Sequence, residues 1–311
     1  MNNSNPAFDE FVRTQADTCI KAAALFLDGK TMSKHGTDPG ALWTTDEEEW
    51  VTEFGSSEPS SWLSEIAVGY LGEAAYELKA IAKLLRSRLV VGSLDVLVRA
   101  VMERSGRVIW VLDDQPLEGT AFNRAARAAL EIGVSSQHYL KTIDDLGATG
   151  VERAQADIND RDHRAKLIKW FSPVRPTGRS KDDIRQWQIK GTKSPGFTAI
   201  AKFAGERCRI TAEQGEGVYG GLSGFSHPSI VFSRESRTPN GSGGIEFNYR
   251  AEDIEKLVRM AVLTFLEALK YCARYYGTGI DSLMAKVFEI EHRLDESSVL
   301  TWRHGNPQGP I

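Results

Sequence analysis

The sequence predicts an all-α protein, a bundle of about five to seven long helices with one small β-hairpin and a basic, Pro/Gly-rich loop. Three observations predict this fold class. Apolar residues recur every three or four positions over almost every long segment. Glycine or proline stands where most of these periodic segments end. Two short β-rich runs flank a single turn-rich segment, which is the pattern of one hairpin.

The first helix is expected over residues 8–28, where the apolar period is continuous and Gly29 follows as a stop signal. A second helix is expected to begin at the acidic run 46–49, which follows Thr44 and Thr45. Carboxylates stabilise the positive end of a helix dipole. We therefore interpret this run as a solvated helix start that needs no acidic-site chemistry.

The remaining helices follow from the same period and from stop signals such as Gly277. They are predicted over residues 62–88, 94–112, 119–146, 150–170, 197–204, 210–214, 252–276 and 281–294, with a glycine-rich helix that ends at His227. The helix over residues 94–112 is the most apolar of them, and Ser93 stands at its cap position. We expect it to be the central helix of the bundle.

Residues 172–196 interrupt this pattern. They hold several prolines and glycines with basic residues between them, which predicts a long loop with at most a short helix around residues 182–188. The β-rich runs 230–232 and 245–249 enclose a Pro-Asn-Gly-Ser-Gly-Gly segment and predict the only sheet of the molecule.

These elements define the expected domains. We predict an acidic helical extension over residues 1–60, a bundle over residues 61–295 and a flexible tail over residues 296–311. The bundle holds the basic loop 172–196 and a hairpin within 228–250.

Composition indicates an ordinary soluble protein. The chain has 311 residues, of which 41% are hydrophobic and 26% charged, with a net charge of −4. No apolar run is long enough for a membrane span, and the N-terminus lacks a basic segment followed by an apolar one. The three cysteines are odd in number and without metal-ligand spacing. We therefore expect a cytoplasmic protein with no membrane contact.

The predicted central helix carries Arg99, Glu103 and Arg107 at positions i, i+4 and i+8, on one face of an apolar segment. A buried ion without a partner is costly, so these groups must be paired or functional. Two interpretations remain open. Arg99 and Glu103 form a pair that fixes the register of the bundle, or the row lines a polar pocket together with Tyr219 and His227.

The glycine-rich segment before Pro228 is the second candidate site. Tyr219, Ser223 and His227 also stand at i, i+4 and i+8, and the glycines between them leave room for a backbone or a ligand. His227 also fits the role of a helix cap. The candidate catalytic residues are thus His227, Arg99, Glu103, Tyr219 and Ser223.

Two short motifs carry a resemblance to a known family. They are Arg99-Ala100-Val101-Met102-Glu103 with Trp110-Val111-Leu112-Asp113, and Tyr219-x-x-Leu222-Ser223-x-x-Ser226-His227. With these motifs, residues 62–276 resemble uncharacterised bacterial helical proteins that are similar to the HEPN superfamily. Helical bundles of that superfamily include many toxin and phage-defence ribonucleases and often form dimers. The resemblance implies a module of a bacterial stress or defence system, directed at RNA, and a homodimer.

The sequence departs from the catalytic HEPN pattern in one respect. Catalytic members carry an arginine a few positions before the histidine on the same helix, but residues 220–226 contain no arginine. A metal-independent RNase would then need Arg99, Arg107 or a partner subunit to supply the positive charge. The resemblance therefore leaves open whether the protein is an enzyme.

Charge is distributed unevenly along the chain. Residues 1–60 hold eleven acidic against four basic residues, whereas residues 151–193 hold eleven basic against six acidic residues. Basic residues interleaved with aromatic rings can bind phosphates and stack on bases. The nucleic-acid-binding candidates are Arg175, Arg179, Lys181 and Trp187. A solvated helix face followed by a basic loop is the alternative.

The sequence contains two pairs of residues with the spacing of metal ligands. Asp160 with His163, and Glu289 with His292, have the i, i+3 spacing of di-iron ligands, to which Glu73 and Glu103 would be added. We interpret both pairs as solvated helix faces, because they stand in charged runs or off the apolar stripe. Neither a phosphate-binding loop nor a dinucleotide fingerprint is present, so we expect no cofactor. A small-molecule pocket in the bundle core remains the alternative to an RNA-directed module.

Overall fold

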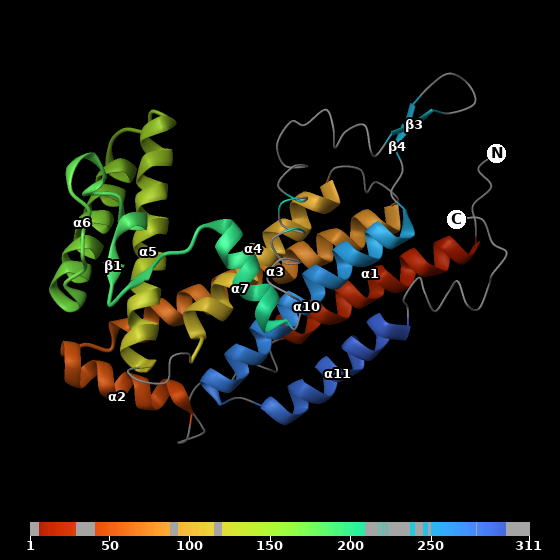
Figure 1. The fold of residues 1–311 in the computed structure, drawn as a ribbon, viewed down its shortest axis with the longest axis horizontal. Helices are drawn as coiled ribbons and strands as arrows, with labels where there is room; N and C mark the ends of the chain where they lie inside the picture. Colours follow the sequence, from red (N-terminus) through yellow and green to blue (C-terminus); the bar gives the residue numbers. More distant parts are fainter. Residues whose placement is uncertain are drawn as a thin grey trace. The chain divides into compact units, whose positions relative to one another are not determined.

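The computed structural model describes most of the chain. The described residues are 6–28, 41–87, 93–114, 120–208, 250–277 and 279–296, with the short stretches 217, 220, 222, 237–239 and 245–247. Within them the protein is all-α with small two-stranded hairpins, as the sequence predicts (Figure 1). None of the described helices is long and apolar enough to cross a membrane.

The chain divides into two compact units. Unit 1 comprises residues 1–38, 70–109 and 197–311, and unit 2 comprises residues 39–69 and 110–196. These limits do not coincide with the boundaries expected at residues 60 and 295. Helices α3 (Glu58–Ser87) and α4 (Ser93–Leu112) contribute residues to both units.

Unit 1 is built around α1 (Pro6–Leu27), α10 (Ala251–Tyr276) and α11 (Ile280–Glu296), which pack against one another. The apolar side chains of α10 recur at three- and four-residue steps and are buried. They include Ile254, Val258, Ala261, Phe265, Leu269 and Cys272. Gly277 ends the helix in the left-handed conformation, with φ of 65°, and its N–H donates to the carbonyl of Ala273. The predicted stop signal is confirmed.

Helix α7 (Phe197–Arg207) packs closely on α4 because position 106 is glycine. A Cβ atom at Gly106 would lie 2.6 Å from Cγ2 of Ile200 and 3.3 Å from Cβ of Ala204. A side chain there would therefore push α7 away from α4. This contact brings Phe197, the first residue of α7, to the charged face of α4.

Unit 2 is built around α5 (Thr120–Asp145), which packs on α2 (Leu42–Phe54) and α6 (Val151–Phe171). Figure 1 shows α5 and α6 side by side. The first half of α5 is buried on all sides, and its interior positions are mostly alanine. Small residues allow neighbouring helices to approach closely, so α5 is the central helix of this unit.

The predicted helix limits are confirmed to within four residues for α1, α3, α4, α5, α6, α10 and α11. The second helix begins earlier than predicted. Because α2 starts at Leu42, the acidic run 46–49 lies beyond its first turn. The dipole interpretation of that run is therefore wrong, since the dipole effect is confined to the first turn. The predicted helix over 210–214 lies outside the described residues.

The basic loop is more regular than predicted. It contains two 3₁₀ turns, η1 (Gly178–Ser180) and η2 (Ile184–Gln186), and an antiparallel hairpin of β1 (Gln188–Ile189) and β2 (Thr192–Lys193). The hairpin expected later in the chain forms between β3 (Arg237–Pro239) and β4 (Ile245–Phe247). The prediction of a single sheet is therefore wrong. The predicted strand 230–232 lies outside the described residues.

Candidate functional site

Two residues of the charged row on α4 form an ion pair. Nε of Arg99 donates to Oε1 of Glu103 over 2.7 Å, and both side chains are mostly buried. The guanidinium groups of Arg99 and Arg107 lie 5.9 Å and 5.3 Å from the ring centroid of Phe197. The ion pair of the first interpretation is thus confirmed, and an aromatic ring covers the two arginines.

A second set of charges, whose pairing was not predicted from the sequence, adjoins this row. Arg104 donates from Nε to Oε2 of Glu73 over 2.5 Å and lies 2.7 Å from Oε1 of Glu77. Burial raises the pKa of Glu77 to about 7, although Arg104 acts in the opposite direction. The i, i+4 spacing of Glu73 and Glu77 was the available signal, but only the fold shows that Arg104 faces both. We call these residues, with Arg99 and Glu103, the α4 charge network.

The other predicted catalytic residues lie outside the described part of the chain. They are Tyr219, Ser223 and His227. A pocket that joins them to Arg99 and Glu103 therefore stays a prediction.

Trp187 lies inside the basic loop rather than on its surface. The residue is 1% exposed, and its Nε1 donates to the carbonyl of Lys181 over 2.9 Å. The guanidinium groups of Arg164 and Arg175 each lie 5.7 Å from the ring centroid of Trp187. The indole holds the loop together, so in this conformation it is not available to stack on a base.

Five of the eleven basic residues within 151–193 form ion pairs with nearby carboxylates. Arg161 pairs with Asp157, and Arg185 pairs with Asp183. Two predicted cations differ, because Arg175 and Lys181 are exposed and have no ion-pair partner within the described ranges. The side chain of the third, Arg179, is outside what the structure describes.

Asp160 and His163 are buried, so the solvated-face interpretation of this pair is wrong. Oδ2 of Asp160 accepts from Nε of Arg164 over 2.6 Å, and Nε2 of His163 lies 2.8 Å from the carbonyl oxygen of Ala129. Burial lowers the pKa of His163, which favours a neutral ring that donates to this carbonyl. The pair Glu289 and His292 is exposed as expected. No group of three metal-ligating side chains occurs in the described part of the chain.

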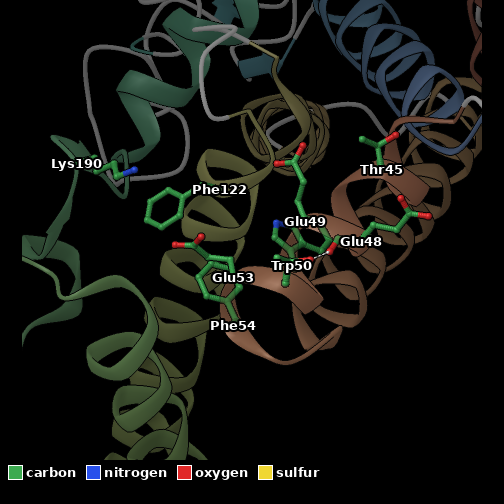
Figure 2. Close-up of a pocket in the computed structure, with 9 residues that line it drawn as sticks. Thr45, Glu48, Glu49, Trp50, Glu53, Phe54, Phe122 and Lys190 are labelled. Atoms are coloured by element: carbon green, nitrogen blue, oxygen red, sulfur yellow. Dashed lines mark hydrogen bonds between the residues drawn. The ribbon is translucent and has the colours of Figure 1, made fainter.

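A pocket in unit 2 gathers acidic and aromatic side chains (Figure 2). Its volume is about 490 Å³. It is lined by Thr45, Glu48, Glu49, Trp50, Thr52, Glu53 and Phe54 of α2, by Phe122 of α5 and by Lys190 of the β1–β2 hairpin. We call it the α2 pocket. Glu48, Glu49 and Glu53 have no ion-pair partner within the described ranges.

Buried polar contacts fix α2 against α5 beneath this pocket. Arg124 donates from Nε and Nη2 to the two carboxylate oxygens of Asp46, each over 2.6 Å, and both side chains are buried. Nε1 of Trp50 donates to the carbonyl of Ala121 over 2.9 Å. A bidentate pair fixes both distance and orientation. The acidic face of α2 is therefore held in a defined position on α5.

The aromatic wall of the α2 pocket is held from behind by other rings. Phe54 lies 6.1 Å from Phe122, 5.5 Å from Trp170 and 5.1 Å from Phe171, measured between ring centroids. Phe122 also meets Phe171 edge to face at 5.4 Å. Such packing restrains the two rings that face the pocket. The wall is thus largely formed before any ligand arrives.

Lys190 supplies the only cation of the pocket lining. Its Nζ lies 3.9 Å from the centroid of the Phe122 ring, and Figure 2 shows the side chain extending towards this ring. In the sequence, Lys190 belongs to the predicted basic loop and the glutamates belong to a predicted helix start. The spacing of Glu49, Trp50, Glu53 and Phe54 places acidic and aromatic groups near one another, but only the fold adds Phe122 and Lys190.

Comparison with known proteins adds no assignment: no family model, no curated protein and no solved structure matches this chain.

Proposed function

We propose that this protein binds a small organic cation, and that the α2 pocket is its binding site. One observation carries the proposal. Three glutamates without ion-pair partners in the described part of the chain line a pocket whose wall is formed by Phe54 and Phe122. Carboxylates and the faces of aromatic rings both attract positive charge, and both disfavour an anion.

The volume and the rigidity of the pocket support this role. Small-molecule sites usually enclose about 300 to 1,000 Å³ and are largely formed in advance. The α2 pocket, at about 490 Å³, falls within that range. The pair of Asp46 and Arg124 and the rings behind Phe54 restrain its walls, so little ordering is needed when a ligand binds.

Calorimetric titration at low salt tests the proposal. We expect butylamine and tetramethylammonium to bind, and butanol and acetate not to bind. Glu53→Gln is expected to weaken cation binding about threefold to tenfold through loss of one attractive charge. Glu47→Gln is the matched control, since Glu47 lies on the same helix but outside the lining. If none of these cations binds at low salt, the proposal is overturned.

An RNA-directed role is the second candidate, favoured by the exposed and unpaired charges of Arg175 and Lys181 in the described structure. Because Trp187 is buried, such binding would rest on phosphate contacts and would weaken steeply with salt. Charge reversal at Arg175 and Lys181 should weaken RNA binding in fluorescence anisotropy. Reversal at Arg161, which is already paired with Asp157, is the control. Indifference to RNA at low salt would exclude this role.

The remaining expectations from the HEPN resemblance stay predictions. They concern a role in bacterial stress or phage defence, a homodimer and a cytoplasmic location. Sedimentation of the purified protein over a range of concentrations tests the dimer.

A further inference from the structure

Lys190 stands at an unusual backbone position. It forms the two-residue turn of the β1–β2 hairpin with Gly191, and both residues have positive φ angles, of 46° and 81°. Such turns prefer asparagine, aspartate or glycine, because a longer side chain costs roughly 1 kcal/mol in the left-handed region. The hairpin alone does not require a lysine here. The presence of a lysine at this position therefore indicates a role beyond the turn.

The ammonium group of Lys190 shows what the Phe122 face accommodates. Its Nζ lies 3.9 Å from the ring centroid, whereas the other cations near rings in the described structure lie at 4.8 Å or more. Lys190 has no ion-pair partner in the described ranges, although three glutamates line the same pocket. The ring thus holds a primary ammonium on an unbranched chain of four carbons, and the carboxylates remain open to other cations.

Charge balance limits the ligand further. Three glutamates and one lysine give the lining a net charge of −2 at neutral pH. A monovalent cation compensates only half of that charge, whereas a linear diamine compensates it in full. If the ligand displaces Lys190 from the ring, the lining holds three carboxylates for the ligand alone. An open pocket of about 490 Å³ has room for such a chain.

The hydrogen-bonding capacity of the lining favours a primary ammonium over a quaternary one. A primary ammonium has three N–H donors, which match the carboxylate oxygens of Glu48, Glu49 and Glu53. A quaternary ammonium has none and is recognised by cages of several aromatic faces. The α2 pocket presents six carboxylate oxygens and three aromatic rings, those of Trp50, Phe54 and Phe122.

We propose that the α2 pocket binds a linear diamine or polyamine, one terminal ammonium of which replaces Nζ of Lys190 over Phe122. This inference rests on the proposed function, because it names the ligand class of the same site. Lys190 is then a tethered competitor that leaves the ring when the ligand binds. Its removal should strengthen binding, although the side chain lines the pocket.

Calorimetry at constant ionic strength tests the ligand class. The probes are 1,4-diaminobutane, a linear triamine, butylamine, tetramethylammonium and Mg²⁺. We expect the diamine to bind at least about tenfold more tightly than butylamine, because its second charge meets a further carboxylate. The triamine should bind more tightly again, and tetramethylammonium more weakly than butylamine.

Variants of the hairpin test the role of Lys190. Lys190→Ala should strengthen diamine binding about threefold to tenfold, because the competing ammonium is removed. Lys193→Ala removes the same charge from the same hairpin outside the lining, so it measures the general electrostatic effect. Lys190→Gly relieves the turn and removes the ammonium, and it should strengthen binding in the same way. Circular dichroism confirms that each variant is folded.

The possible outcomes distinguish the polyamine inference from the proposed function as an organic-cation site. Equal affinity for butylamine and the diamine, or tighter binding of tetramethylammonium, overturns the polyamine inference and leaves an organic-cation site. Equal or tighter binding of Mg²⁺ also overturns it, because simple charge attraction then suffices. Weaker diamine binding by both Lys190 variants shows that Lys190 is not a competitor. Absence of binding by every amine overturns the proposed function itself.

Discussion

Helices α4 and α2 carry similar numbers of charged residues but use them differently. On α4 in unit 1, Arg99 pairs with Glu103 and Arg104 pairs with two glutamates of α3. On α2 in unit 2, Asp46 is buried against Arg124, whereas the three glutamates of the pocket have no ion-pair partner in the described structure. Charges that have an ion-pair partner hold the helices together, whereas charges without such a partner beside aromatic rings are available to a ligand.

The comparison shows that residue type does not decide the role of a charge. Both regions contain glutamates at i, i+4, namely Glu49 with Glu53 on α2 and Glu73 with Glu77 on α3 beside α4. Arg104 forms ion pairs with both glutamates of the second pair, and no arginine reaches the first within the described ranges. The two glutamate pairs differ in the side chain that a neighbouring helix places beside them.

The largest expected effect comes from breaking the buried pair under the α2 pocket. Asp46→Ala should lower the free energy of unfolding by about 3 to 5 kcal/mol, because Arg124 is left buried without its carboxylate. Urea denaturation measures the change. The double variant Asp46→Ala with Arg124→Met should recover much of the loss. A loss below about 1 kcal/mol in the single variant would show that the pair does not fix α2 on α5.

A smaller effect, dependent on pH, is expected in the α4 charge network. Burial raises the pKa of Glu77 from 4.5 to about 7, so the folded protein binds this proton more tightly than the unfolded chain. The contribution of Glu77 to the free energy of unfolding is therefore fully present below pH 4.5 and is lost as the pH rises to about 7. Glu77→Gln should reduce the loss of stability between pH 5 and pH 8 by about 1 to 2 kcal/mol.

Thermal denaturation across this pH range checks the prediction. Glu73→Gln is the control, because Glu73 binds the same arginine from a more exposed position. The same pH dependence in Glu77→Gln and in the wild type would contradict the raised pKa of Glu77.

The smallest expected effects have opposite signs in the two regions. Glu103→Gln should lower the free energy of unfolding by about 0.5 to 1 kcal/mol, since it weakens the pair with Arg99. Glu49→Gln should raise it by a few tenths of a kcal/mol, because it removes repulsion from Glu53 at i+4. Chemical denaturation of both variants measures the two changes. Destabilisation by Glu49→Gln would show that this glutamate has a structural partner.

Periodicity and stop signals in the sequence were enough to predict the fold class and most helices. Gly277 illustrates why, since a glycine in the left-handed conformation ends α10 as predicted. The short hairpin in the basic loop was missed, because strands of two residues give no alternating pattern and Lys190-Gly191 is a weak turn signal. The pairing of Arg99 with Glu103 was predictable, because both residues lie on one helix at i, i+4.

Which segments are helical and which carry charge can be read from the sequence, because both properties depend on residues that are neighbours along the chain. The burial of Asp46, the position of Trp187 inside its loop and the contact of Lys190 with Phe122 depend instead on the packing of distant segments. These contacts join residues from 68 to 78 positions apart, or depend on the folding of a whole loop. Such distances between residues are set by the packing of helices, which local patterns do not specify.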